Sequence, residues 1–244
     1  VTEGAPGTGV APGWFKTSGN QIVDSAGNPV QIAGVNWFGM ESETFAPHGL
    51  WTRNYKDMMN QMAALDFNTI RLAYSSEMLH TTAAPNGIDF AKNPDLAGLT
   101  PVQIMDKIVA YAGDIGMRVI LDHHRSTAGA GTSENGLWYD SQYSEASWIA
   151  DWKMLAQRYA GNPTVIGADL HNEPYNGTWG GGGATDWAAA AGLTLVGIDN
   201  VPGSVPIEPY DLPRGCVLVF GQEGPGLSAP MREVCEVILH IEQY

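Results

Sequence analysis

The sequence has 244 residues, enough for one large α/β domain or two small ones, and 44% of them are hydrophobic, which excludes wholesale disorder. Twelve basic and 26 acidic residues give a net charge of −14, and the scattered basic residues argue against a nucleic-acid partner. No apolar run is long enough for a membrane-spanning helix, and two cysteines leave the redox compartment open.

The first 33 residues predict a leader segment and a hairpin. Residues 1–13 are rich in Gly, Pro and Ala, which is typical of a linker or a processed N-terminus. Residues 21–23 and 29–32 flank a turn that contains Gly27, and this pattern predicts a β-hairpin. By analogy, such a hairpin closes the bottom of a barrel.

Strands and helices alternate in the next part of the chain. Four short apolar runs without strict alternation predict strands that are buried on both faces, namely residues 32–37, 69–74, 118–122 and 165–170. Helices are predicted over residues 55–65, 100–115 and 144–159. For the second helix, Thr100 is the expected cap, Pro101 the first helical residue and Gly116 the stop. This order predicts parallel βαβ units.

The composition changes after Trp187, where a four-glycine run at 180–183 has just ended. Three further strands and one helix are predicted over residues 193–198, 217–220, 237–241 and 227–235. We therefore place a domain boundary near residue 190. The expected division is a leader over 1–13, a first domain over 14–190 and a second over 191–244.

Polar side chains follow the carboxyl ends of the four central strands, where the loops of a parallel barrel build the active site. These side chains are Arg71, His123, His124, His171, Asn172 and Glu173, with Trp37 at the end of the first strand. Taken alone, Arg71 would be an ion-pair partner. Adjacent histidines point to opposite faces of a strand, so at most one of the two enters a site, and no zinc-binding spacing occurs. The joint occurrence favours a functional site.

Four segments resemble family 5 glycoside hydrolases, specifically cellulases (endo-β-1,4-glucanases). They are IAGVNWFG at 32–39, NTIRL at 68–72, VILDHH at 119–124 and DLHNEP at 169–174. The resemblance covers about residues 14–187. It implies a (β/α)8 barrel that cleaves β-1,4-glucan with retention, needs no metal or organic cofactor, and is secreted.

The same resemblance implies roles for individual residues. Glu173 matches the general acid/base, and Asn172 would hold the sugar 2-hydroxyl and the nucleophile. The remaining substrate-binding residues would be Trp37, Arg71, His123, His124 and Trp179. The two tryptophans would stack on glucose rings, because their faces and the C–H faces of sugars are both apolar.

The matched region holds about four of the eight βα units, so we interpret it as a truncated barrel, and the family's glutamate nucleophile is not in it. Glu223, just after the predicted strand 217–220, could take that role. Other candidates are Asp122, Glu134, Glu145 and Asp169, or a carboxylate of a second subunit. Exposed edges of a half-barrel also favour self-association into a homo-oligomer.

The tail resembles a different family. Residues 192–197, 218–228 and 238–241 resemble SpoU-type RNA 2′-O-ribose methyltransferases, and glycines there would approach S-adenosylmethionine. Seven acidic and two basic residues after position 190 fit RNA poorly. We instead expect the tail to add parallel strands that complete or cover the half-barrel. The fold class is thus α/β, and the alternative to a glucanase is a carbohydrate-binding half-barrel without catalysis.

Overall fold

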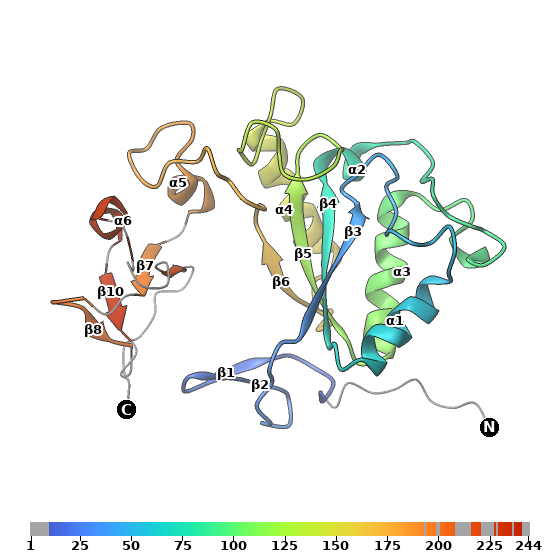
Figure 1. Ribbon diagram of the computed structural model, residues 1–244, viewed down its shortest axis with the longest axis horizontal. Helices are drawn as coiled ribbons and strands as arrows, with labels where there is room; N and C mark the ends of the chain where they lie inside the picture. Colours follow the sequence, from blue (N-terminus) through green and yellow to red (C-terminus); the bar gives the residue numbers. More distant parts are fainter. Residues whose placement is uncertain are drawn as a thin grey trace. The chain divides into compact units, whose positions relative to one another are not determined.

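The structure is a computed structural model that describes residues 10–192, 194–198, 201–207, 216–220, 227, 229–235 and 237–240. The chain divides into two compact units, Val1–Glu173 and Pro174–Tyr244 (Figure 1). Each unit has its own parallel sheet, so the molecule is an α/β protein.

The first unit is built on a four-stranded parallel sheet of order β3-β4-β5-β6. The strands are β3 (Gly34–Met40), β4 (Thr69–Ser75), β5 (Arg118–Arg125) and β6 (Val165–Asp169). In the register, Ala73 of β4 lies opposite Asp122 of β5, which lies opposite Asp169 of β6. The predicted parallel βαβ arrangement is confirmed, and the register places two carboxylates side by side.

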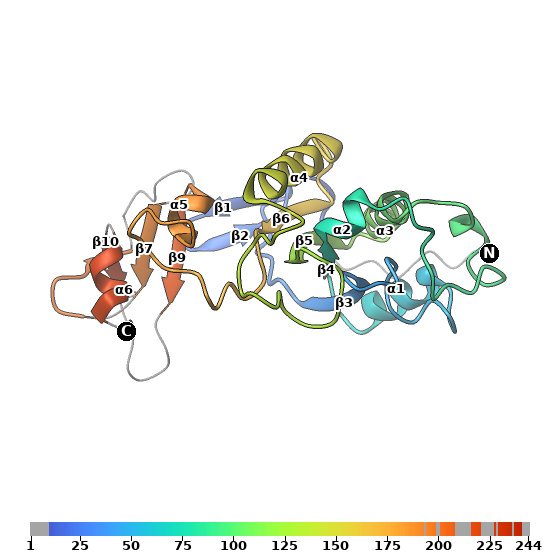
Figure 2. The same ribbon diagram turned by 90° about the horizontal axis from the view of Figure 1, so that it is seen from above.

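Three long helices connect these strands and lie along one side of the sheet (Figure 2). They are α1 (Tyr55–Ala64), α3 (Pro101–Asp114) and α4 (Glu145–Arg158), each within one residue of its predicted bounds. The structure adds a five-residue helix, α2 (Ser76–His80), and a 3-10 helix over Pro94–Leu96. Sequence periodicity did not predict α2 because one and a half turns are too short to show a repeat.

Helix α3 shows why these helices form where they do. The Thr100 side chain accepts from the Gln103 N–H and the Gln103 side chain accepts from the Thr100 N–H, a complete capping box, with Pro101 at the first turn. Ile104, Met105 and Ile108 are fully buried on one face. They pack against the strands, and this contact fixes α3 on the sheet.

The N-terminal hairpin differs from the prediction. Strand β1 (Lys16–Ser18) pairs antiparallel with β2 (Gln21–Val23), whereas the predicted second strand at 29–32 contributes only an isolated bridge between Val23 and Pro29. Proline lacks the N–H that a ladder requires, so β2 takes its partner from the residues that precede it.

The second unit also contains a parallel sheet, of order β8-β10-β7-β9. Its elements are α5 (Trp187–Ala191), β7 (Thr194–Ile198), β8 (Val205–Pro206), β9 (Cys216–Phe220), α6 (Ala229–Val234) and β10 (Val237–His240). All three predicted strands and the predicted helix are present, and β8 is additional. The N-cap side chain of Asp186 accepts from the Ala189 N–H and starts α5.

Candidate active site

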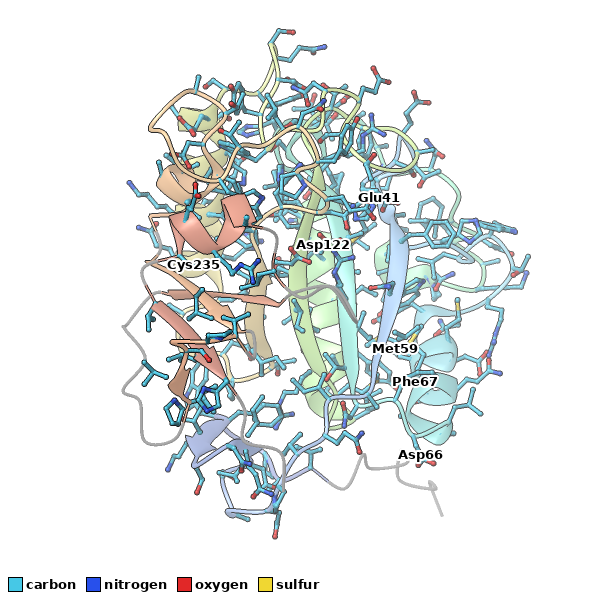
Figure 3. All side chains as sticks on the ribbon, turned by 60° about the vertical axis from the view of Figure 1, so that its left-hand side comes forward. Glu41, Met59, Asp66, Phe67, Asp122 and Cys235 are labelled. Carbon is cyan, nitrogen blue, oxygen red and sulfur yellow. The ribbon has the colours of Figure 1, made fainter. Side chains whose placement is uncertain are left out.

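The guanidinium of Arg71 joins three neighbouring strands. From β4, its Nη1 lies 2.9 Å from Oδ2 of Asp122 on β5, and its Nη2 lies 2.6 Å from Oδ2 of Asp169 on β6. Its Nε also donates to the same Asp169 oxygen at 2.9 Å. Figure 3 shows Asp122 on β5. Arg71 therefore neutralises two carboxylates that the strand register brings together.

His124 shares the Asp122 carboxylate with Arg71. The His124 Nδ1 lies 2.7 Å from Asp122 Oδ2, and the Asp122 side chain is fully buried. Burial raises the pKa of Asp122, while the contacts with His124 and Arg71 oppose this rise. The Asp122 contact at Nδ1 fixes the imidazole and leaves Nε2 of His124 on the side of Asn172.

Asn172 and Glu173 follow β6 directly. The Asn172 Oδ1 accepts from Arg71 Nη2 at 3.0 Å, and its Nδ2 lies 3.5 Å from Nε2 of His124. Glu173 is exposed, and with a φ of +48° it is one of few non-glycine residues in the left-handed region. Its carboxylate makes no hydrogen bond or ion pair with the residues that the structure describes. A fixed amide therefore stands beside a solvent-facing acid.

Two predicted substrate-binding residues are buried instead. His123 is 0% exposed, and both of its ring nitrogens have protein partners, Ser76 and His171. Trp37 is 4% exposed, belongs to the core, and donates its indole N–H to the His48 carbonyl. Neither side chain has a face open to a sugar, because each points to the packed side of its strand.

The other predicted residues lie elsewhere or outside the description. Trp179 is half-buried in the second unit, and Glu223 lies outside the described residues. Glu145 accepts the indole N–H of Trp138, and the exposed Glu134 lies 3.9 Å from Arg125. The structure therefore brings together Arg71, His124, Asn172, Asp122 and Asp169, with Glu173 next to them in sequence.

Sequence reasoning missed an exposed aromatic cluster. The rings of Phe38 and His48 stack at 4.2 Å, and Trp51 meets His48 edge-on at 4.2 Å. Phe38 is 51% and Trp51 46% exposed. Strand alternation places Trp37 and Phe38 on opposite faces, but it does not tell which of the two faces solvent.

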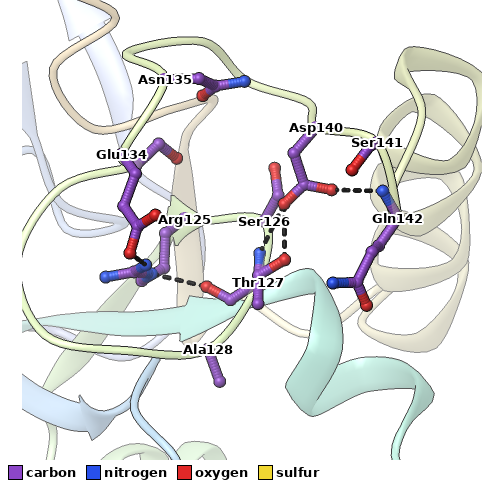
Figure 4. A pocket seen from close by; sticks show the side chains of 10 residues that line it. Arg125, Ser126, Thr127, Ala128, Glu134, Asn135, Asp140, Ser141 and Gln142 are labelled. Atoms are coloured by element: carbon purple, nitrogen blue, oxygen red, sulfur yellow. Dashed lines mark hydrogen bonds and ion pairs between the residues drawn. The ribbon is translucent and has the colours of Figure 1, made fainter.

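A polar cavity of about 270 Å³ lies beside the carboxyl end of β5 (Figure 4). In it, Arg125 donates to the carbonyl of Thr127 at 2.5 Å, and Asp140 accepts from the Thr127 hydroxyl at 2.6 Å. Burial raises the pKa of Asp140, but the hydrogen bonds that it accepts from Thr127 and from the backbone N–H groups of Tyr143 and Gln142 outweigh this and lower it. The charges are satisfied within the loop, and Glu173 does not line the cavity.

The described residues contain neither a candidate metal site nor a candidate membrane-spanning helix. None of their His, Cys, Asp and Glu side chains form a group of three that could hold a metal ion. Their helices are all too short or too polar to cross a bilayer.

Comparison with known families agrees with this geometry. The cellulase family, glycosyl hydrolase family 5, matches residues 23–201. The chain belongs to this family. An endoglucanase from Paenibacillus polymyxa is 52% identical over 181 residues, which are 73% of this chain and 45% of that protein. The major extracellular endoglucanase of Xanthomonas campestris pv. campestris is 49% identical over 173 residues, 70% of this chain and 35% of that protein.

Solved structures of an endoglucanase and an endocellulase resemble this family 5 chain. The catalytic domain of the Xanthomonas campestris pv. campestris enzyme matches with a TM-score of 0.66 and 47% identity, covering 73% of this chain and 51% of that one. An endocellulase from Pyrococcus horikoshii in complex with cellotetraose matches with a TM-score of 0.66 and 42% identity, covering 73% and 52%. The chain thus spans between about a third and a half of the length of these relatives.

Proposed function

We propose that this chain carries the acid/base half of an endoglucanase site that cleaves β-1,4-glucan. Glu173 donates a proton to the glycosidic oxygen as the bond breaks. One observation carries this proposal: Arg71, held by Asp122 and Asp169, fixes the Asn172 amide directly before an exposed Glu173, in a chain that belongs to family 5. The cellotetraose in the Pyrococcus horikoshii complex supports a β-glucan chain as the substrate.

The neighbours of Glu173 have distinct roles in this proposal. Asn172, held by Arg71 and close to His124, holds the sugar 2-hydroxyl. His124 and Arg71 keep the amide in one orientation, so the hydrogen bond needs no reorganisation when charge develops on the sugar.

In this proposal, aromatic residues other than Trp37 stack on the glucose rings. The exposed faces of Phe38 and Trp51 are suited to the apolar faces of glucose rings, and Trp179 remains a proposed platform in the second unit. Replacing Trp51 by Ala should raise KM for glucan more than it lowers kcat, because stacking is present in both ground and transition states.

A retaining reaction also needs a nucleophilic carboxylate at about 5–5.5 Å from the acid. Asp122 and Asp169 are held by Arg71, and a paired carboxylate is a poor nucleophile. Glu223 therefore stays our proposed nucleophile. An active Glu223→Gln protein would contradict this assignment, and a carboxylate from a second copy would then be the next candidate.

Replacing Glu173 by Gln tests the proposal directly. We expect the release of reducing ends from carboxymethylcellulose to fall by about 10²–10⁴-fold, because the amide cannot donate an acid proton. Glu43→Gln is the control: this glutamate is also exposed, and its replacement should leave the rate unchanged. Glucan binding by a wild-type chain that releases no reducing ends would favour the carbohydrate-binding alternative.

The remaining proposals concern the second unit and the setting of the protein. Amide exchange of β6, measured in the full chain and in a chain ending at 190, tests two of them. These are the domain division at residue 190 and a second sheet that completes or covers the half-barrel. Secretion is supported by the extracellular relative. Self-association is tested by sedimentation equilibrium.

The methyltransferase resemblance rests on the sequence of residues 192–244 alone. Its glycine-rich segment at 221–226 lies outside the described residues. We expect no heat of S-adenosylmethionine binding in calorimetry, and measurable binding would revive that alternative.

A further inference from the structure

A line of buried polar side chains lies behind Asn172 and Glu173, and the proposed reaction does not use it. The Ser76 hydroxyl lies 3.0 Å from Nε2 of His123, and Nδ1 of His123 lies 2.8 Å from Nδ1 of His171. The exposed fractions are 0% for Ser76 and His123 and 4% for His171. The line runs from the first residue of α2, through β5, to the end of β6.

His123 holds two consecutive residues at that end. Its ring contacts the His171 ring, and its backbone carbonyl accepts the Asn172 N–H at 3.0 Å. The next residue is Glu173, with its left-handed φ of +48°. A non-glycine residue persists in this region only where its surroundings over-determine the backbone. His123 supplies two of those constraints.

Both histidines are neutral at neutral pH. Burial lowers the pKa of His171 to about 3, and burial is also the main reason that the pKa of His123 lies well below its usual value. A neutral imidazole has one donor and one acceptor. At the short Nδ1–Nδ1 contact, one ring must therefore donate and the other accept.

The ends of this line are the Ser76 hydroxyl and the His171 ring. The Tyr74 ring lies 5.6 Å from the His123 ring, and its side chain is fully buried.

We propose that His123 and Ser76 are positioning residues that hold Asn172 and Glu173 in place through this line of buried hydrogen bonds. The proposal rests on the proposed function for its catalytic consequence, but its structural content is independent of activity. It replaces the substrate-binding role that the sequence suggested for His123.

Long-range ¹H–¹⁵N NMR spectra of the 244-residue chain test the line. We expect His123 to carry its proton on one ring nitrogen only, because each of its nitrogens has a fixed partner. Ser76→Ala should mix the two His123 tautomers and speed exchange of the Asn172 amide on the order of tenfold, because the His123 ring loses its fixed partner. Ser126→Ala is the matched control: this serine is 2% exposed, and its hydroxyl has no partner in the described part of the chain.

Several outcomes decide the proposal. Two His123 tautomers in the wild-type chain, or unchanged His123 tautomers and Asn172 exchange in Ser76→Ala, would overturn it. If the wild-type chain is active, Ser76→Ala should lower kcat on the order of tenfold with little change in KM, as expected for a displaced acid. An inactive wild-type chain with the expected tautomers would overturn the proposed function and support the positioning line.

Discussion

Arg71 is the residue on which the candidate site depends most. Its planar guanidinium reaches Asp122, Asp169 and Asn172 at once, with 24% of the side chain exposed. An ammonium group has no such fork, so one lysine nitrogen cannot satisfy three partners in fixed directions. The charge alone would leave the fully buried Asp122 carboxylate poorly paired.

Replacing Arg71 by Lys should therefore lower the free energy of unfolding by about 1–3 kcal/mol, measured by urea denaturation. Arg53→Lys is the control, because Arg53 pairs with Asp57 at the surface and should change stability by less than about 0.5 kcal/mol. Equal losses in both variants would show that Arg71 contributes only its charge.

The sequence placed the correct residue types at the strand ends but could not distinguish between neighbours. Trp37 and Phe38, or His123 and His124, differ by one position, and this position decides which face of the strand each occupies. Because the four strands of the first sheet are apolar on both faces, the pattern gave no sign of which face is the open one.

At the scale of elements, helix α3 was predictable because its signals are local. Thr100, Pro101 and Gly116 act on the backbone within four residues of themselves. Replacing Thr100 by Ala should cost about 1 kcal/mol of unfolding free energy, measured by thermal or urea denaturation. Gln103→Ala should cost less, because it leaves the Thr100 hydroxyl on the Gln103 N–H. The reverse order would contradict the capping assignment.

Two buried side chains, His171 and Asp122, make the free energy of unfolding depend on pH. Because the folded-state pKa of His171 is about 3, below its unfolded value, its contribution is present at neutral pH and is lost on acidification. Below about pH 6.5, each such histidine should remove about 1.4 kcal/mol per pH unit. Asp122, whose pKa is raised, acts oppositely: its contribution is complete at low pH and is lost as pH rises through the folded-state pKa.

Comparing variants separates these opposing effects. We measure the unfolding free energy by urea denaturation between about pH 7 and pH 5. Its slope against pH should be smaller in His171→Gln by about 1.4 kcal/mol per pH unit, which corresponds to one proton. His48→Gln, at an exposed histidine, should keep the wild-type slope. An unchanged slope in His171→Gln would mean that His171 is protonated in the folded protein.

At the scale of the whole molecule, two compact units predict unfolding in more than one step. The first unit contains six of the eight tryptophans: Trp14, Trp37, Trp51, Trp138, Trp148 and Trp152. Tryptophan fluorescence should therefore follow mainly the first unit, while far-ultraviolet circular dichroism follows both. We expect the two urea transitions not to coincide, and coincident midpoints and slopes would contradict independent units.

The sequence by itself determined the order of strands and helices, their parallel direction, and the motifs that match family 5. Capping, periodicity and short motifs act over a few residues, so they can be read along the chain. Only the tertiary structure decided that Arg71 holds Asp122 and Asp169, and that His123 faces His171 while His124 faces the site. These contacts join residues 48 to 98 positions apart, and they depend on strand register, which no local signal specifies.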